Sequence, residues 1–172
     1  MATHSAPPTA ATPLQRFLAR PHVVVGGVYG TVLGSSMTAA LTKETAGDRR
    51  YDATWLLITA AVTAAAHGYA HLIATRAQRR FGARAAVRTV VDEWPLAVGA
   101  LPSVVLLLGA GIGWWPSRGI EYVTFAVNIV LLFGWGLFAA RTGGRTWLSA
   151  LSIGVGDALL GLVVVLANAL VK

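Results

Sequence analysis

The chain has 172 residues, of which 55% are hydrophobic and only 12% are charged. A soluble domain of this size carries about a quarter charged residues, so the composition excludes an ordinary water-facing surface and indicates one that faces lipid. The chain has no cysteine, which excludes disulfides, thiolate metal sites and cysteine nucleophiles. Its net charge of +7 lies in short loops between apolar stretches, so it indicates membrane topology and not nucleic-acid binding.

Residues 1–20 form the first segment, which begins with a stretch rich in Thr, Ala and Pro, and we predict a disordered cytoplasmic N-terminus there. It is not a secretory signal peptide, because several further apolar stretches follow the first one. Five apolar stretches are each long enough to cross a bilayer, which needs about 20 residues. They cover residues 22–42, 53–75, 94–115, 122–140 and 147–171. We therefore predict that residues 21–172 form an all-α, polytopic bundle of five transmembrane helices.

Basic residues are distributed unevenly between the two predicted sides of the membrane. Nine Lys and Arg lie on the side of the N-terminus and five on the other side. The positive-inside rule then places the N-terminus in the cytoplasm and the C-terminus outside a bacterial-type inner or plasma membrane. Aromatic residues lie at the predicted span ends, as expected for a belt at the lipid interface. They are Trp94, Trp114, Trp115, Tyr122 and Trp147.

The longest connection, residues 76–93, mixes arginines with apolar residues. Phe81, Ala85, Val87 and Val91 are interspersed with Arg79, Arg80, Arg84 and Arg88. This pattern predicts a short amphipathic helix on the membrane surface.

The first predicted span carries Gly26, Gly30 and Gly34, which repeat every four residues. Small residues at this spacing let two helix backbones approach closely in lipid, so this face is expected to pack on another helix. That helix belongs either to the same chain or to a second copy, in a homodimer through Gly-rich helix faces. Glycines at 154, 156 and 161 make the last span similar.

Asp157 lies about eleven residues into the last span, near the expected bilayer midplane. A carboxylate there costs several kcal/mol unless it is paired, hydrated or protonated. The residue therefore predicts an ion or proton site, a general acid, or a structural hydrogen bond to a neighbouring helix.

His67 and His71 lie four residues apart on one face of the second span. This spacing suits a metal pair, a proton relay, or hydrogen bonds across helices. By depth, we expect His67 to meet Asp157. The side chains predicted to line a transport or proton path are Asp157, His67, His71, Asn128, Tyr69 and Tyr29. No P-loop, GxSxG or HExxH motif of soluble enzymes is present.

Several segments give the chain a resemblance to the vacuolar iron transporter family. They are Gly26-Gly27-Val28-Tyr29-Gly30, the proline-bounded stretch from Trp94-Pro95 to Trp115-Pro116, and Gly134 to Arg141 followed by Thr142-Gly143-Gly144-Arg145 and Trp147-Leu148-Ser149. The resemblance implies five membrane helices, a cytoplasmic N-terminus and a dimer.

The metal-ligand positions of that family are not matched in this chain. Tyr29 stands where the family's first helix carries Asp, and Ala65 and Tyr69 stand where its second helix carries Met and Glu. An Arg-rich stretch, residues 76–88, replaces the family's glutamate-bearing insert. A site built from His67, His71 and Asp157 would have to differ from the family's own.

Three functions fit the sequence. The leading hypothesis is a transporter of a cation or small solute, coupled to protons through an intramembrane Asp/His site. The first alternative is a membrane-embedded enzyme that acts on a lipid or isoprenoid, with Asp157 as general acid. Its expected apolar cavity is walled by Trp135, Phe125, Phe133 and Tyr69. The second alternative is a structural accessory subunit.

Overall fold

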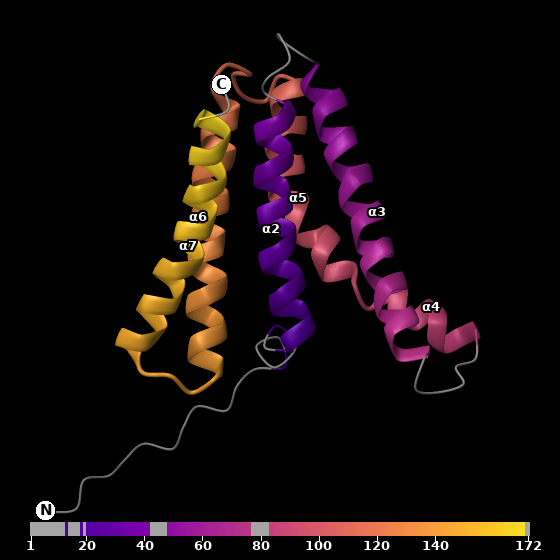
Figure 1. Ribbon diagram of the computed structural model, residues 1–172. Helices are drawn as coiled ribbons and strands as arrows, with labels where there is room; N and C mark the ends of the chain where they lie inside the picture. Colours follow the sequence, from indigo (N-terminus) through magenta and orange to yellow (C-terminus); the bar gives the residue numbers. More distant parts are fainter. Residues whose placement is uncertain (1–12, 14–17, 19, 42–47, 77–82, 171–172) are drawn as a thin grey trace, which may run out of the picture.

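The computed structural model describes residues 13, 18, 20–41, 48–76 and 83–170, and this part of the chain is helical (Figure 1). The helices are α2 (Pro21–Leu41), α3 (Arg49–Arg76), α4 (Ala83–Val91), α5 (Trp94–Gly111), α6 (Ile120–Thr142) and α7 (Trp147–Leu170). All except α4 are long and apolar enough to cross a membrane. The predicted all-α architecture with five candidate spans is thus confirmed. The predicted disordered segment, residues 1–20, lies largely outside the described residues.

The exterior of the helix bundle differs from that of a water-soluble protein. Large apolar side chains face outward along every long helix, for example Val62 on α3, Val130 on α6 and Val163 on α7. The buried side chains are mostly apolar, and several polar side chains are buried among them, including Thr31 and Asn128, which are both 0% exposed. Because an apolar exterior suits lipid and polar groups in lipid need partners, this pattern fits a membrane location.

The glycine face of α2 is occupied by α5 of the same chain. A Cβ atom on Gly26 would overlap Pro95 and Leu96, and one on Gly30 would overlap the carbonyl oxygen of Leu96. A Cβ on Gly34 would lie 2.7 Å from the Ser103 hydroxyl. The two helices run in the same direction, and their backbones meet at every fourth residue. The predicted helix-packing role of this face is confirmed, and association of two copies would need other surfaces.

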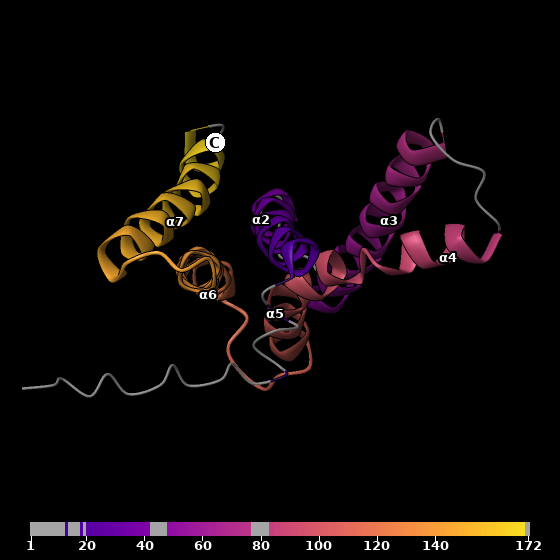
Figure 2. The same cartoon turned by 90° about the horizontal axis from the view of Figure 1, so that it is seen from below.

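The helices form two groups. α2 and α3 both pack on α5, while α6 packs most extensively on α7. The groups meet where α2 contacts α6 and α7 and where α5 contacts α6. Seen from below, α2 lies between α7 and α3 (Figure 2). We call the contact between these two groups the seam.

Two predicted boundaries differ from the structure by four residues, and the other boundaries within the described residues agree to within two. The second span starts four residues early, at Arg49, because Arg49 and Asp52 form an ion pair at helical spacing, 3.2 Å apart. The third span ends four residues early, at Gly111. Gly113 adopts a φ of +85°, and the backbone N–H of Trp114 donates to the carbonyl of Gly109, which closes the helix.

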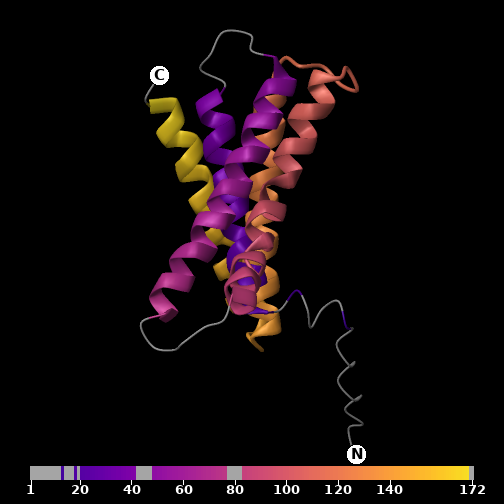
Figure 3. The same ribbon diagram turned by 90° about the vertical axis from the view of Figure 1, so that its right-hand side faces the viewer.

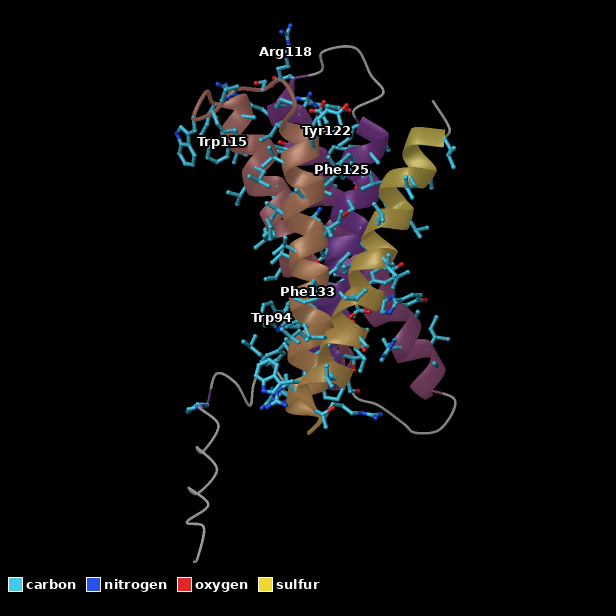
Figure 4. The ribbon with its side chains drawn as sticks, turned by 90° about the vertical axis from the view of Figure 1, so that its left-hand side faces the viewer. Trp94, Trp115, Arg118, Tyr122, Phe125 and Phe133 are labelled. Atoms are coloured by element: carbon cyan, nitrogen blue, oxygen red, sulfur yellow. The ribbon has the colours of Figure 1, made fainter. Side chains whose placement is uncertain are left out.

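The expected aromatic belt is visible at both ends of the bundle. Trp115 and Tyr122 lie near the end that carries Arg118, and Trp94 lies toward the other end (Figure 4). Trp114 and Trp147 are both exposed. Their positions suit the two lipid–water interfaces of a membrane.

Candidate functional site

A hydrogen-bonded triad of polar side chains crosses the seam near the middle of the bundle. Asn128 of α6 donates from its Nδ2 to the Ser35 hydroxyl of α2, at 3.0 Å, and to the Ser103 hydroxyl of α5, at 2.9 Å. The Ser103 hydroxyl is also placed to donate to Asn128 Oδ1, at 3.2 Å. All three side chains are almost completely buried. The triad therefore joins three helices and both groups at one point.

Buried hydroxyls around the triad are satisfied within their own helices. The Thr31 hydroxyl donates to the carbonyl of Gly27, at 2.7 Å, and the Thr124 hydroxyl to that of Ile120, at 2.9 Å. Thr31 Oγ1 also lies 3.4 Å from the carbonyl oxygen of Gly99 on α5. The side-chain amide of Asn128 differs from these hydroxyls, because its hydrogen bonds go to side chains of other helices. This amide can change its hydrogen-bond partners only if the helices move or another molecule takes the place of the two serine hydroxyls.

The end of the seam opposite the N-terminal end of α2 is held by an ion-paired cluster. Arg49 of α3 lies 3.2 Å from Asp52 and 3.5 Å from Glu121 of α6. Glu121 Oε2 is shielded from solvent and receives no hydrogen bond from the described residues. Arg50 donates from Nε to the carbonyl of Gly111, at 3.0 Å, which ties α3 to the end of α5. A surface pocket of about 530 Å³ lies against this cluster.

We expect the Arg49→Met variant to lose about 2 kcal/mol of unfolding free energy. Removing one partner of a buried pair costs about 3–5 kcal/mol, and the partial exposure of Arg49 lowers that figure. Arg118→Met is the matched control, because Arg118 is exposed at the same end. Unfolding of both purified variants in mixed detergent, followed by circular dichroism, measures the difference. Equal stability of the two variants would contradict the structural role of Arg49.

A small cavity lies in the other half of the bundle, where α2, α5 and α6 meet. Its volume is about 260 Å³. Its lining residues include Trp94, Trp135 and Thr31, which lies one turn from Ser35. The indole of Trp135 lies directly against Gly27, where a Cβ atom would overlap it. The triad therefore has an ion-paired cluster on one side and a mainly apolar cavity on the other.

Asp157 lies between α7 and α6, because Gly136 leaves room for it. A Cβ on Gly136 would overlap a carboxylate oxygen of Asp157. Gly136 is eight residues from Asn128 on the same buried stripe of α6, about 12 Å along the helix axis. Glu121, seven residues before Asn128, lies half-buried on the same side of α6, at the ion-paired cluster. The acidic and amide groups thus follow one side of α6.

The two histidines of α3 form a separate cluster. The ring centroids of His67 and His71 are 5.4 Å apart, and Tyr29 of α2 lies 5.6 Å from His67. His71 Nδ1 lies 3.8 Å from Glu93 Oε1, just before α5. Tyr69 is 58% exposed and does not join the rings. No three His, Asp or Glu side chains within the described ranges are grouped to hold a metal ion.

The expected meeting of His67 with Asp157 does not occur among the main helix contacts. α3 packs on α2, α4 and α5, whereas α7 packs on α2 and α6. α3, which carries the two histidines, and α7, which carries Asp157, lie on different sides of α2 (Figure 2). His67 and Asp157 were expected to meet because they lie at similar depths along their helices. The order of the helices in the bundle keeps them apart.

The apolar cavity expected for an enzyme is not assembled as anticipated. Trp135 lines the cavity between α2, α5 and α6, but Phe125, Phe133 and Tyr69 are not among its lining residues. Phe133 instead packs against Gly154 of α7. Asp157 does not line the cavity either, so a general acid and an apolar chamber are not combined at this place.

Ser103 and Glu93 were missed by sequence reasoning. A lone serine in an apolar span carries no pattern of its own. Glu93 lies outside the apolar stretches from which the spans are predicted. Its spacing from His71 depends on how α3 and α5 pack, which no local pattern contains.

The chain was compared with protein-family models, curated proteins and solved structures, and no match was found in any of the three.

Proposed function

We propose that the protein is a small membrane transporter, and that a cation or small polar solute crosses along the seam between the α2–α3–α5 group and the α6–α7 pair. The observation that carries this proposal is the buried triad of Asn128, Ser35 and Ser103. Amide and hydroxyl groups in lipid need partners, so their hydrogen bonds favour one helix arrangement. The same groups can bind a polar solute when the helices separate.

The two ends of the seam differ in a way that supports alternating access. On the outer side, the pair of Arg49 and Glu121 bridges the groups. On the other side, the cavity lined by Trp94 and Trp135 reaches toward Thr31. In this proposal the ion pair is an outer gate that is closed here. Opening it would exchange the Arg49–Glu121 contact for water.

Proton coupling is assigned to Asp157 in this proposal. Its carboxylate lies at membrane depth on the α6 stripe that also carries Asn128, and protonation changes its preference for water or for the helix contact. The cluster of His67, His71 and Tyr29 would be a second place where protons are exchanged.

We place the N-terminus in the cytoplasm because basic residues are distributed unevenly between the loops on the two sides. Membership in the vacuolar iron transporter family stays a prediction.

We expect Asp157→Asn to abolish the pH dependence of cation flux and to lower its rate at least about tenfold, as expected for loss of a proton-transfer group. Proteoliposomes loaded with a pH-sensitive dye are challenged in turn with K⁺, Mg²⁺, Mn²⁺ and choline. Asp157→Glu should retain coupling, because the carboxyl group is kept. Gly156→Ala is the matched control on the same helix, because no side chain or backbone atom lies near its Cβ position.

Two outcomes test the role of Asp157 in proton coupling and the transport activity separately. Unchanged coupled flux in Asp157→Asn would reject Asp157 as the coupling group while leaving transport standing. Absence of flux for every probe in the wild-type protein would reject this transport proposal and favour an accessory role.

A further inference from the structure

α4 presents a face on which arginines and valines alternate. Val87 and Val91 are 64% and 59% exposed, and Arg84 and Arg88 are exposed beside them. At 100° per residue, these four positions fall within an arc of about 100° of the helix. The arginines and the valines therefore face the same surroundings.

The opposite side of α4 is fixed to the bundle. Gly68 of α3 lies so close to Val90 and Thr89 that a Cβ atom on it would be 2.6 Å from the Val90 Cα. α4 lies across the view in Figure 1 and is seen close to end-on in Figure 3, so its axis crosses the bundle direction near the lower end of α3. A short helix held in this orientation keeps its outward face in one position relative to the spans.

The segment of sequence that contains this face is strongly basic. Five arginines and no acidic residue occur between residues 76 and 91. The acidic residues that follow are Asp92 and Glu93, and Glu93 lies toward His71. Arg20, Arg141 and Arg145 also belong to this end of the bundle, where α2 and α7 begin and α6 ends. Exposed valines beside guanidinium groups match the boundary between acyl chains and anionic headgroups.

We propose that the α4 face formed by Arg84, Val87, Arg88 and Val91 binds anionic phospholipid headgroups of the surrounding leaflet. The guanidinium groups contact the phosphates, while the two valines enter the adjoining acyl region. This surface is independent of the transport proposal, since it needs neither the seam nor Asp157. It assigns a lipid-binding site to a segment that otherwise only connects α3 to α5.

Native mass spectrometry of the full-length protein in detergent tests this site. Dioleoyl phosphatidylglycerol is the anionic probe and dioleoyl phosphatidylcholine the neutral one. We expect the wild-type protein to prefer phosphatidylglycerol, and the double variant Arg84→Gln, Arg88→Gln to bind it roughly 30-fold more weakly, at about a fivefold loss per charge. The double variant Arg84→Lys, Arg88→Lys should stay within about threefold of wild type, because it keeps both charges.

Two controls isolate the α4 face. Arg118→Gln removes an exposed charge at the opposite end and should leave the preference unchanged. Inorganic phosphate at the same concentration should not displace the lipid, because it lacks the acyl chains that contact the valines. A wild-type protein without preference would overturn the proposal, and would point to an acidic protein partner. A glutamine double variant that keeps the full preference would overturn it as well.

Discussion

Gly30→Ala is expected to destabilise the protein by about 3 kcal/mol, at the upper end for overpacked sites. The added Cβ would overlap the backbone carbonyl of Leu96, and a further Cβ contact would fall on the Cα of Gly99. Backbone atoms cannot rotate away as a side chain can, so α2 and α5 must separate along their shared face. Unfolding in mixed detergent, followed by circular dichroism, measures the loss.

Gly156→Ala is the matched control for this substitution. It lies in a span of similar length, and nothing lies within 4 Å of the position that its Cβ would take. Its stability should change by less than about 1 kcal/mol, because alanine favours a helix over glycine. If Gly30→Ala proves as stable as Gly156→Ala, the close packing of α2 on α5 is wrong.

Asn128→Leu is expected to lower the unfolding free energy by about 2 kcal/mol and to abolish transport. Leucine has a similar volume but removes the amide that bonds to both serines. The Ser103 hydroxyl then loses its Asn128 partner, whereas the Ser35 hydroxyl can still donate to the carbonyl of Thr31, at 3.1 Å. An unsatisfied buried hydroxyl costs about 1–3 kcal/mol.

A triple variant separates the structural role of the triad from its role in transport. Asn128→Leu combined with Ser35→Ala and Ser103→Ala removes donors and acceptors together, so much of the lost stability should return. Transport should remain absent, since the side chains that form hydrogen bonds across the seam are removed. Recovered transport in the triple variant would show that the triad only packs helices.

Much of the architecture could be predicted from the sequence because it depends on local properties. The number of spans follows from the length of each apolar stretch, which must match the bilayer thickness. The packing face of α2 follows from glycines at a spacing of four. The helix over Ala83–Val91 follows from its amphipathic pattern. Each of these signals is contained within one segment.

The candidate site could be predicted only in part. Asn128 was singled out as a polar side chain at membrane depth that lines a path, and the structure shows that its amide joins helices, because an amide at that depth needs partners. Its actual partners, Ser35 and Ser103, lie 93 and 25 residues away in sequence. Asp157 was identified by its charge, yet its place against Gly136 follows from the pairing of α6 with α7.

By itself, the sequence determined an all-helical chain with five apolar helices, a face of α2 that must meet another helix, and a short amphipathic helix rich in arginine. Only the tertiary structure decided that α5 covers that face, that the triad joins both groups, and that α2 separates His67 from Asp157. The physical reason is that the outside and inside of a membrane bundle are both apolar. Hydropathy therefore gives a helix its length and depth, but packing alone sets its rotation and its neighbours.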